Sequence, residues 1–365
     1  MSVRIFVPRW MDQRNNNAQN SNARALLSRF SDGRAHWTAV CSRKAAVATM
    51  PGTVGLVPVS SSRFWSYRLA LAYQGQWDAI FYPGPHWADE LGIKARRLLR
   101  RRRPVIATME GIIAAPQALR QVTALTGHLV FSQPGVEAAI PRIRWIYETC
   151  DHIIAISPFL ARAAKALYGD KVSGLPIGLE TSIFHNRGRH EPDRARVVGC
   201  GTVKSSKRPE VFLELAQRYP EADFVWFGDG PTRHQLMRGS ECKSLNNLAF
   251  PGALTPQALA EEFRRSSLFV LPSHAEGVPK VTQEAAACGL AVVLHGFYEC
   301  PSVVHKENGF VTWSDEELVD AVGILLADGE LRRNLGQRGA EMGKSWSWDT
   351  VAPQWEDLVI RLATS

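Results

Sequence analysis

Long hydrophobic runs are missing from this chain of 365 residues, and no stretch approaches the ~20 apolar residues of a membrane-spanning helix. The opening residues, MSVRIFVPRW, are interrupted too soon for a signal peptide and are predicted to form a first strand. The six cysteines are scattered without a CxxC pair, which favours free thiols in a reducing compartment over disulfides or a zinc site. These absences predict a cytoplasmic protein.

Metal-ligand patterns are also absent from the sequence. The ten histidines show no H-x-x-x-H spacing, and an Asp-x-Asp pair occurs nowhere in the chain. We therefore expect no metal site and no cofactor.

Positive charge is unevenly distributed. The formal net charge is +8, and a basic cluster lies at Lys94, Arg96, Arg97 and Arg100–Arg103. One interpretation is a solvated helix end, where cations also complement the helix dipole. The other is attraction to anionic phospholipid at the inner face of the membrane, with each nearby cation contributing ~1 kcal/mol. No nucleic-acid recognition motif accompanies the cluster, so we expect no nucleic-acid partner.

The length suits two domains, and alternating strand and helix patterns predict an α/β protein with parallel sheets. A polar segment rich in turn-forming residues, 181–194, is the best candidate for a linker. The predicted division is residues 1–183 for a first domain, 195–346 for a second, and 347–365 for a C-terminal helix that packs on the first. Predicted strands lie at residues 3–7, 36–41, 54–59, 78–82, 105–109, 152–156, 196–200, 223–227, 247–250, 267–271 and 290–294.

The most informative segment is LPSHAEGVPKVTQEAAACGLAVV, residues 271–293. It predicts a β-α-β unit with Pro279 as the first residue of the helix. Glu276 then lies in the turn at the carboxyl end of a strand, where ligands bind in open α/β sheets. Glu284 lies about five residues into the helix, roughly 7–8 Å along its axis. One carboxylate can face the reactive end of an extended ligand while the other binds a hydroxyl further back.

The same segment resembles the signature of retaining GT-B glycosyltransferases of the GT4 type, also called glycosyl transferases group 1. Ten residues are in register with P-S, E-G-F-G and E-A-x-A-x-G-x-P-V-V: Pro272, Ser273, Glu276, Gly277, Glu284, Ala285, Ala287, Gly289, Val292 and Val293. The chain departs from this pattern at Val278-Pro279, where Phe-Gly is usual, and at Ala291. The resemblance implies two Rossmann-like domains with parallel sheets facing a cleft, and a C-terminal helix that crosses back to the first domain.

The resemblance also implies an activity: transfer of a sugar from a nucleotide-sugar to a saccharide or lipid-linked acceptor, with retention of configuration. Cell-surface polysaccharide or glycoconjugate synthesis is the expected setting. Glu276 would contact the donor sugar with the backbone of Gly277 and Val278, and Glu284 would accept hydrogen bonds from ribose hydroxyls. The turn from Phe250 to Gly252 would lie near the base.

The diphosphate would bind the loop Gly201–Pro209, through Gly201, Lys204 and Lys207. Lys207 matches the lysine of the family's G-R-x-x-x-x-K pattern, but Thr202 stands where its arginine is expected. In the first domain, Glu110 replaces a histidine that many relatives use to reach the donor sugar. It is expected to bind a sugar hydroxyl or stabilise positive charge at the anomeric carbon; a solvated or helix-capping role is equally open.

Two other functions remain open from the sequence. The first is a GT-B-fold nucleotide-sugar epimerase or a phosphorylase, although a phosphorylase would need a pyridoxal-phosphate lysine that the sequence does not identify. The second is a non-enzymatic basic protein that binds membranes or nucleic acid through residues 96–103. The missing Asp-x-Asp pair argues against the metal-dependent GT-A type of transferase.

Overall fold

The structure is a computed structural model, and it describes residues 2–10, 18–31, 33–42, 54–59, 76–85, 89–98, 103–111, 140–239, 244–274 and 276–365. The chain divides into two compact units. Unit 1 consists of Met1–Gly178 together with Trp348–Ser365, and unit 2 consists of Leu179–Ser347. Within the described part of the chain, no helix is long and apolar enough to cross a membrane.

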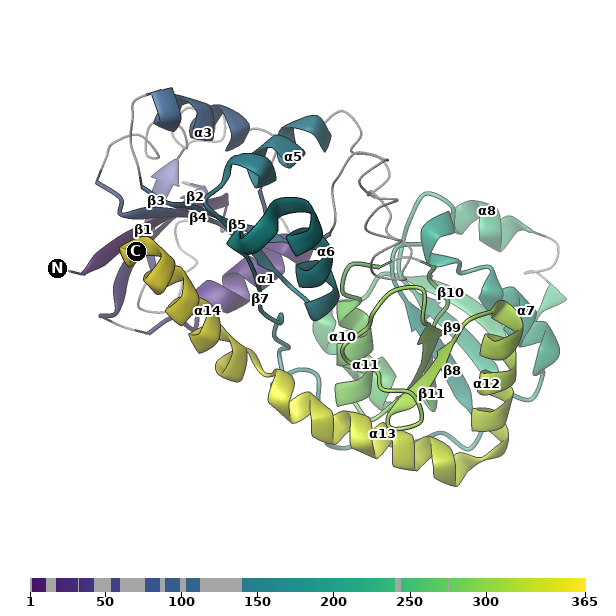
Figure 1. Ribbon diagram of the computed structural model, residues 1–365. Coiled ribbons are helices and arrows are strands. Elements are labelled where there is room, and N and C mark those ends of the chain that lie inside the picture. The colour runs from purple at the N-terminus through teal and green to yellow at the C-terminus, as the bar shows by residue number, and fades with distance from the viewer. Residues whose placement is uncertain are drawn as a thin grey trace. The chain divides into compact units, whose positions relative to one another are not determined.

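Unit 1 is built on a parallel sheet with strand order β3-β2-β1-β4-β5-β6-β7 (Figure 1). Its strands are β1 Val3–Trp10, β2 Ala35–Ser42, β3 Val54–Val59, β4 Ala79–Tyr82, β5 Val105–Met109, β6 His152–Ala155 and β7 Val172–Gly174. Its helices are α1 Ala18–Leu27, α3 Asp89–Leu98, α5 Ile140–Thr149, α6 Pro158–Tyr168, the 3-10 turn η2 Gly169–Lys171 and α14 Trp348–Thr364.

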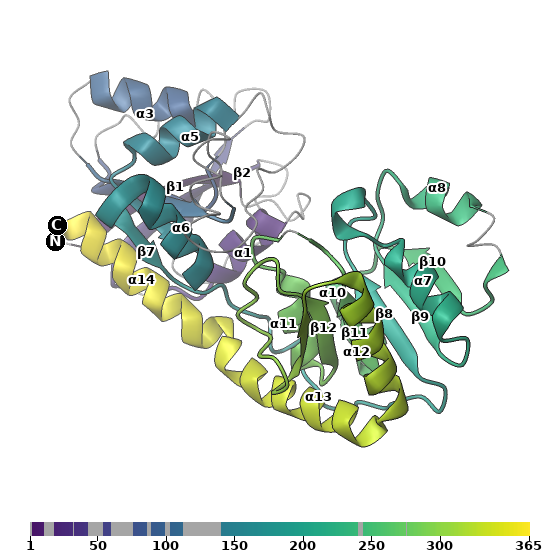
Figure 2. The ribbon, with the colours of Figure 1, turned by 45° about the vertical axis from the view of Figure 1, so that its right-hand side comes forward.

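Helix α14 returns to unit 1 after the chain has completed unit 2, and it packs on α1 and β1 (Figure 2). The indole N–H of Trp355 donates to the carbonyl of Pro176 at 2.8 Å, and its ring packs near Phe81. A Cβ at Gly178 would lie 2.4 Å from the ring of Trp348, so this contact needs a residue without a side chain. Buried tryptophans therefore attach the end of the chain to unit 1.

Unit 2 has a second parallel sheet, with order β10-β9-β8-β11-β12-β13. Its strands are β8 Arg196–Cys200, β9 Asp223–Phe227, β10 Leu248–Gly252, β11 Leu268–Leu271, β12 Ala291–His295 and β13 Gly309–Thr312. Its helices are the 3-10 turn η3 Ser205–Lys207, α7 Val211–Arg218, α8 Arg233–Arg238, α10 Pro256–Arg264, α11 Lys280–Ala287, α12 Asp315–Ala327, α13 Gly329–Gly343 and the 3-10 turn η4 Lys344–Trp346.

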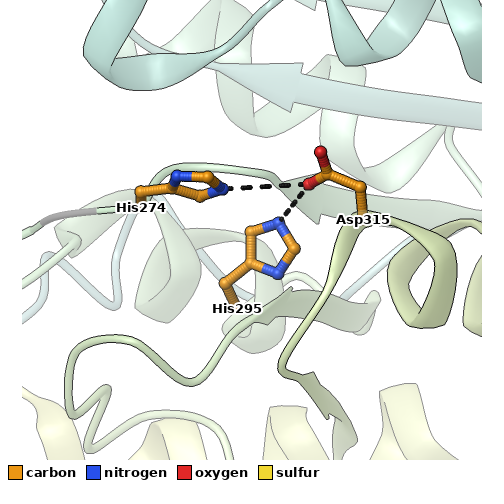
Figure 3. A group of neighbouring side chains, drawn as sticks. All are labelled: His274, His295 and Asp315. Atoms are coloured by element: carbon orange, nitrogen blue, oxygen red, sulfur yellow. Dashed lines mark hydrogen bonds and ion pairs between the residues drawn. The ribbon is translucent and has the colours of Figure 1, made fainter.

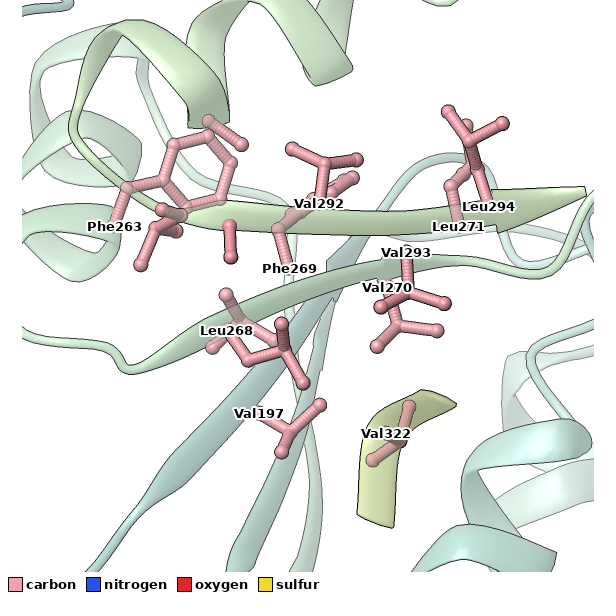
Figure 4. Packing of buried hydrophobic residues seen from close by; sticks show 14 of the residues in the cluster. Val197, Phe263, Leu268, Phe269, Val270, Leu271, Val292, Val293, Leu294 and Val322 are labelled. Atoms are coloured by element: carbon pink, nitrogen blue, oxygen red, sulfur yellow. The ribbon is translucent and has the colours of Figure 1, made fainter. Parts of the chain in front are cut away.

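The central strands β11 and β12 of unit 2 are buried on both faces, as helices on both sides of a parallel sheet require. Phe269 and Val292 lie on the face that packs against Phe263 of α10 (Figure 4). Leu268 and Val293 lie on the opposite face, toward Val322 of α12 (Figure 4). Because both faces of the sheet are covered, polar side chains are found in the loops at the ends of these strands.

The prediction of two α/β units with parallel sheets is confirmed. Three details differ. Residues 181–194, predicted as a linker, belong to unit 2, because Phe184 is buried in its core beside Phe263. Pro279 precedes α11 as its N-cap residue and is not the first residue of the helix. The strands β7 and β13 were not predicted, since three or four residues are too few to show an apolar pattern.

Candidate functional site

The polar residues singled out in unit 2 gather at the carboxyl edge of its sheet, in the loops that follow β8 and β11. Lys207, from the loop after β8, places its Nζ 2.5 Å from Oε1 of Glu276, from the loop after β11. Both side chains are largely shielded from water. The Lys207 side chain also lies along Gly201, where a Cβ would contact it at 3.4 Å. The structure therefore brings together three of the predicted residues: Gly201, Lys207 and Glu276.

The loops after β8, β9 and β10 are joined by backbone hydrogen bonds. Gly201 donates to Phe227 at 2.9 Å, Val203 donates to Asp229 at 3.0 Å, and Gly228 donates to Gly252 at 2.9 Å. Gly228 has φ +143°, and a Cβ there would lie 2.0 Å from the Gly201 carbonyl oxygen. The Gly-Asp-Gly-Pro turn is thus needed for close approach of two loops.

Phe250 and Gly252, predicted to lie near a base, belong to the last residues of strand β10. The guanidinium of Arg233, at the start of α8, donates to the Phe250 carbonyl through Nε at 3.2 Å and Nη2 at 2.6 Å. Arg233 was not predicted from the sequence, because no motif marks it. Its two donors hold the backbone at the end of β10 in one geometry.

Glu284 lies on α11. Burial, and next the charge of Glu284, raise the pKa of the Cys200 thiol at the end of β8 to about 12. Burial raises the pKa of Glu284 itself, and Lys280 acts in the opposite direction. No described residue donates a hydrogen bond to this carboxylate. A half-buried carboxylate without a donor among the described residues is suited to ligand hydroxyls.

The other predicted residues of these loops are more open to water. Lys204 and Thr202 are exposed, and Gly277 and Val278 are half-buried after Glu276. Beside this loop the hydroxyl of Tyr298 is buried and has no hydrogen-bond partner among the described residues. Burial, and next the charge of Glu276, raise the pKa of Tyr298. Tyr298 is therefore a neutral polar group close to Glu276 that sequence motifs did not reveal.

A second polar cluster lies on the same edge, toward β13. His274, His295 and Asp315 place their ligand-type atoms within 4.8 Å of one another, with both imidazoles directed at Asp315 (Figure 3). Two imidazoles and one carboxylate suit a divalent metal, but Arg208 already occupies this cluster. Its guanidinium donates to both oxygens of Asp315, at 2.5 and 2.6 Å, and to Nε2 of His274 at 2.5 Å. It lowers the pKa of Asp315 to about 2. We assign no metal to this cluster.

Glu110 belongs to unit 1, where it follows β5 and is half-buried. Its charge contributes to the raised pKa of Tyr147, after burial and Tyr168. Of the basic cluster, Lys94 pairs with Glu90 at 2.5 Å and Arg103 lies 3.8 Å from Asp78. The other side chains of that cluster, from Arg96 to Arg102, lie outside the described residues. Two of its cations thus have acidic neighbours in unit 1.

Comparison with known proteins finds a family match within unit 2. Residues 181–342 match the model of glycosyl transferases group 1. The alpha-galactosylglucosyldiacylglycerol synthase of Streptococcus pneumoniae is 24% identical over 273 residues, which cover 69% of this chain and 68% of that protein. The sulfoquinovosyl transferase of Arabidopsis thaliana is 24% identical over 225 residues, 56% of this chain, and the match spans only 44% of the relative's own length.

Solved structures extend the similarity to both units. Sucrose-phosphate synthase from Thermosynechococcus elongatus aligns over 100% of both chains with a TM-score of 0.76 and 17% identity. Anabaena HepE, solved in complex with UDP-glucose, aligns over 98% of this chain and 99% of its own with a TM-score of 0.71 and 16% identity. The fold is therefore GT-B, and the match to glycosyl transferases group 1 lies in unit 2.

Proposed function

We propose that this protein transfers a sugar from a nucleotide-sugar donor to a saccharide or lipid-linked acceptor, with retention of anomeric configuration. The contact between Lys207 and Glu276 carries the proposal. It places a cation and a carboxylate 2.5 Å apart at the ligand-binding edge of a parallel sheet. Cleavage of a nucleotide-sugar needs a cation for the departing diphosphate and an acceptor for the hydroxyls of the sugar.

The donor is proposed to bind along the loops of unit 2. The base lies at the turn from Phe250 to Gly252, which Arg233 supports, and the ribose hydroxyls donate to Glu284. The diphosphate lies at Gly201 and Lys207, with the exposed Lys204 as a second cation. Before the donor binds, Lys207 and Glu276 pair with each other. The diphosphate then binds Lys207 in place of Glu276, and the Glu276 carboxylate becomes available to the hydroxyls of the sugar. We propose that no metal is needed, since lysines supply the positive charge.

Uridine is the first nucleotide to test. Among the similar structures, Anabaena HepE, Staphylococcus aureus TarM and the pneumococcal O-GlcNAc transferase GtfA were each solved in complex with UDP. The contacts proposed for the base in this chain are mainly with backbone atoms at the end of β10, from Phe250 to Gly252. Specificity among nucleotides therefore depends on the shape of that segment more than on a particular side chain.

The acceptor is proposed to be bound by unit 1, and Glu110 is proposed to bind a sugar hydroxyl or to stabilise charge at the anomeric carbon. The name of the pneumococcal relative, a diacylglycerol-based glycolipid synthase, supports a lipid-linked acceptor. A basic cluster with six arginines between positions 96 and 103 suits peripheral docking on an anionic membrane from the cytoplasmic side. Polysaccharide or glycoconjugate synthesis is the setting we propose.

The test is to incubate the full chain with UDP-, GDP- and ADP-glucose without an acceptor and to follow the released sugar by proton NMR. We expect slow hydrolysis of one donor, with the retained anomer appearing before mutarotation. Release of the inverted anomer would overturn retention, and formation of an epimerised nucleotide-sugar would favour an epimerase. Absence of binding and hydrolysis across a wider panel of sugars would overturn the proposal.

A further inference from the structure

Arg208, next to Lys207, adopts a backbone conformation that residues with side chains disfavour. Its φ and ψ are 54° and 48°, in the left-handed region. Arg208 and Lys306 are the two non-glycine residues with positive φ in the part of the chain that the structure describes. Glycine adopts this conformation without strain, whereas a residue with a side chain is held in it by the surrounding structure.

The side chain of Arg208 connects three loops at the carboxyl edge of the sheet. Its guanidinium forms a two-point contact with Asp315, the first residue of α12, and donates to Nε2 of His274 in the loop after β11. His295, at the end of β12, approaches the same Asp315 oxygen at 3.1 Å, and Figure 3 shows both imidazoles directed at this carboxylate. We call Arg208, His274, His295 and Asp315 the arginine clamp.

Proton positions in the arginine clamp follow from the fact that arginine only donates. Nε2 of His274 accepts from Arg208 and so carries no proton. Burial lowers the pKa of His295, so its ring is neutral and Nε2–H donates to Asp315. Nδ1 of His295 lies 3.1 Å from the hydroxyl of Thr312, which donates to the Leu294 carbonyl at 3.1 Å. A divalent metal would have to displace the guanidinium from both His274 and Asp315, so the guanidinium occupies the position that a metal ion would need.

The clamp holds the two loops that carry the reactive pair. Lys207 immediately precedes Arg208, and Glu276 follows His274 by two residues. On its other side, the loop after β8 is attached to the loop after β9 by backbone hydrogen bonds from Gly201 and Val203. Backbone bonds therefore fix this loop on the β9 side, while on the β11 side it depends on side chains.

We propose that Arg208 is a positioning residue. Through its contacts with Asp315 and His274 it holds Lys207 and Glu276 in the positions that bind the donor. This inference rests on the proposed function and adds a residue to it. When a diphosphate draws Lys207 away from Glu276, their mutual contact is lost and no longer orders the two loops. The clamp remains and keeps both groups in place as the bond to the sugar breaks.

The decisive variant is Arg208→Gly, because glycine relieves the backbone strain while it removes the clamp. We expect a folded protein whose kcat falls at least tenfold, while KM for the donor changes less than about threefold. Asp315→Asn should act similarly, and the double variant should be no worse than either single one, since both remove the same contact. Arg208→Lys should recover part of kcat, because it keeps the charge without the planar fork.

Lys306→Gly is the matched control, since it makes the same backbone change at φ 64° on an exposed turn outside the clamp. It should leave kcat unchanged. Hydrogen exchange gives a readout that does not depend on turnover. Amides of residues 203–208 and 276–278 should exchange faster in Arg208→Gly and at the wild-type rate in Lys306→Gly.

Each failure has a distinct signature. If the wild type turns over no nucleotide-sugar, the proposed function fails, while faster exchange in Arg208→Gly would still support the clamp. Wild-type kcat and wild-type exchange in Arg208→Gly would overturn the clamp while leaving the proposed function intact. Stoichiometric Zn²⁺ binding to EDTA-treated wild type that is lost in Asp315→Asn would also overturn it, because a metal would then fill the place of the guanidinium.

Discussion

Lys207 and Glu276 are 69 positions apart in the chain, yet their side chains meet at 2.5 Å in the core of the candidate site. Each follows a different strand of one parallel sheet, β8 and β11, and those strands are hydrogen-bonded neighbours. The proximity of the pair thus follows from strand order. Substitutions at Lys207 and at the residues around it test the roles proposed for them.

Lys207→Ala should lower kcat by about 100-fold, the size of effect seen when a preorganised charge-stabilising donor is removed. KM for the donor should change much less, because the diphosphate gains charge only as the bond breaks. Steady-state kinetics with the accepted nucleotide-sugar measure both constants. Arg218→Ala, which removes an exposed cation at the far end of α7, is the control. A kcat like that of the control would contradict this role.

Glu284→Ala should weaken nucleotide binding by about 1–3 kcal/mol, since ribose hydroxyls lose a charged acceptor. Calorimetry with the free nucleoside diphosphate measures this without turnover. The control Glu214→Ala removes an exposed carboxylate from α7 and should bind normally. Unchanged affinity for UDP, GDP and ADP in Glu284→Ala would exclude the ribose assignment.

Glu284→Gln should stabilise the protein at high pH but not at low pH. Burial raises the folded-state pKa of Glu284, so ionisation is harder in the folded state than in the unfolded chain. The penalty is absent below the unfolded pKa and grows as pH rises through the raised folded value. We expect the variant to gain about 1 kcal/mol, or about 2–4 °C in Tm, at pH 8 and nothing at pH 4. An equal gain at both pH values would show that ionisation is not the cause.

Turnover should survive excess EDTA, because Lys207 and Lys204 supply the positive charge that a metal would otherwise provide. The measurement compares kcat before and after chelation, and again after Mn²⁺ or Mg²⁺ is added back. Activity that disappears with EDTA and returns with Mn²⁺ would refute metal-independent transfer.

The basic cluster should bind anionic vesicles. Wild type should sediment with vesicles containing phosphatidylglycerol at low salt, and less at high salt, where charges are screened over ~8 Å or less. A variant with Arg100, Arg101, Arg102 and Arg103 changed to serine should remain in the supernatant.

The charge-matched control changes four exposed arginines of unit 2 to serine: Arg218, Arg238, Arg265 and Arg338. It should sediment like wild type. Equal sedimentation of the two variants would identify the cluster as a solvated helix end.

The alternation of apolar strand and helix patterns was enough to predict two parallel α/β units, because buried strands between helices leave a signal in almost every segment. Glu276 was correctly placed after its strand, and Glu284 in the following helix. These are local features, since a few neighbouring residues decide where a strand ends and a helix begins. The position of Lys207 just before a helix was predictable for the same reason.

Contacts between distant loops were decided by the tertiary structure alone. Arg208 appeared in the sequence as one more basic residue of a loop, and nothing near it indicated a partner 107 positions away at Asp315. Likewise, Arg233 and Tyr298 become relevant only once the end of β10 and the loop after β11 are in place. A sequence encodes the period of each strand and helix in adjacent residues, whereas the pairing of side chains across a sheet edge depends on strand order and loop geometry, which exist only after folding.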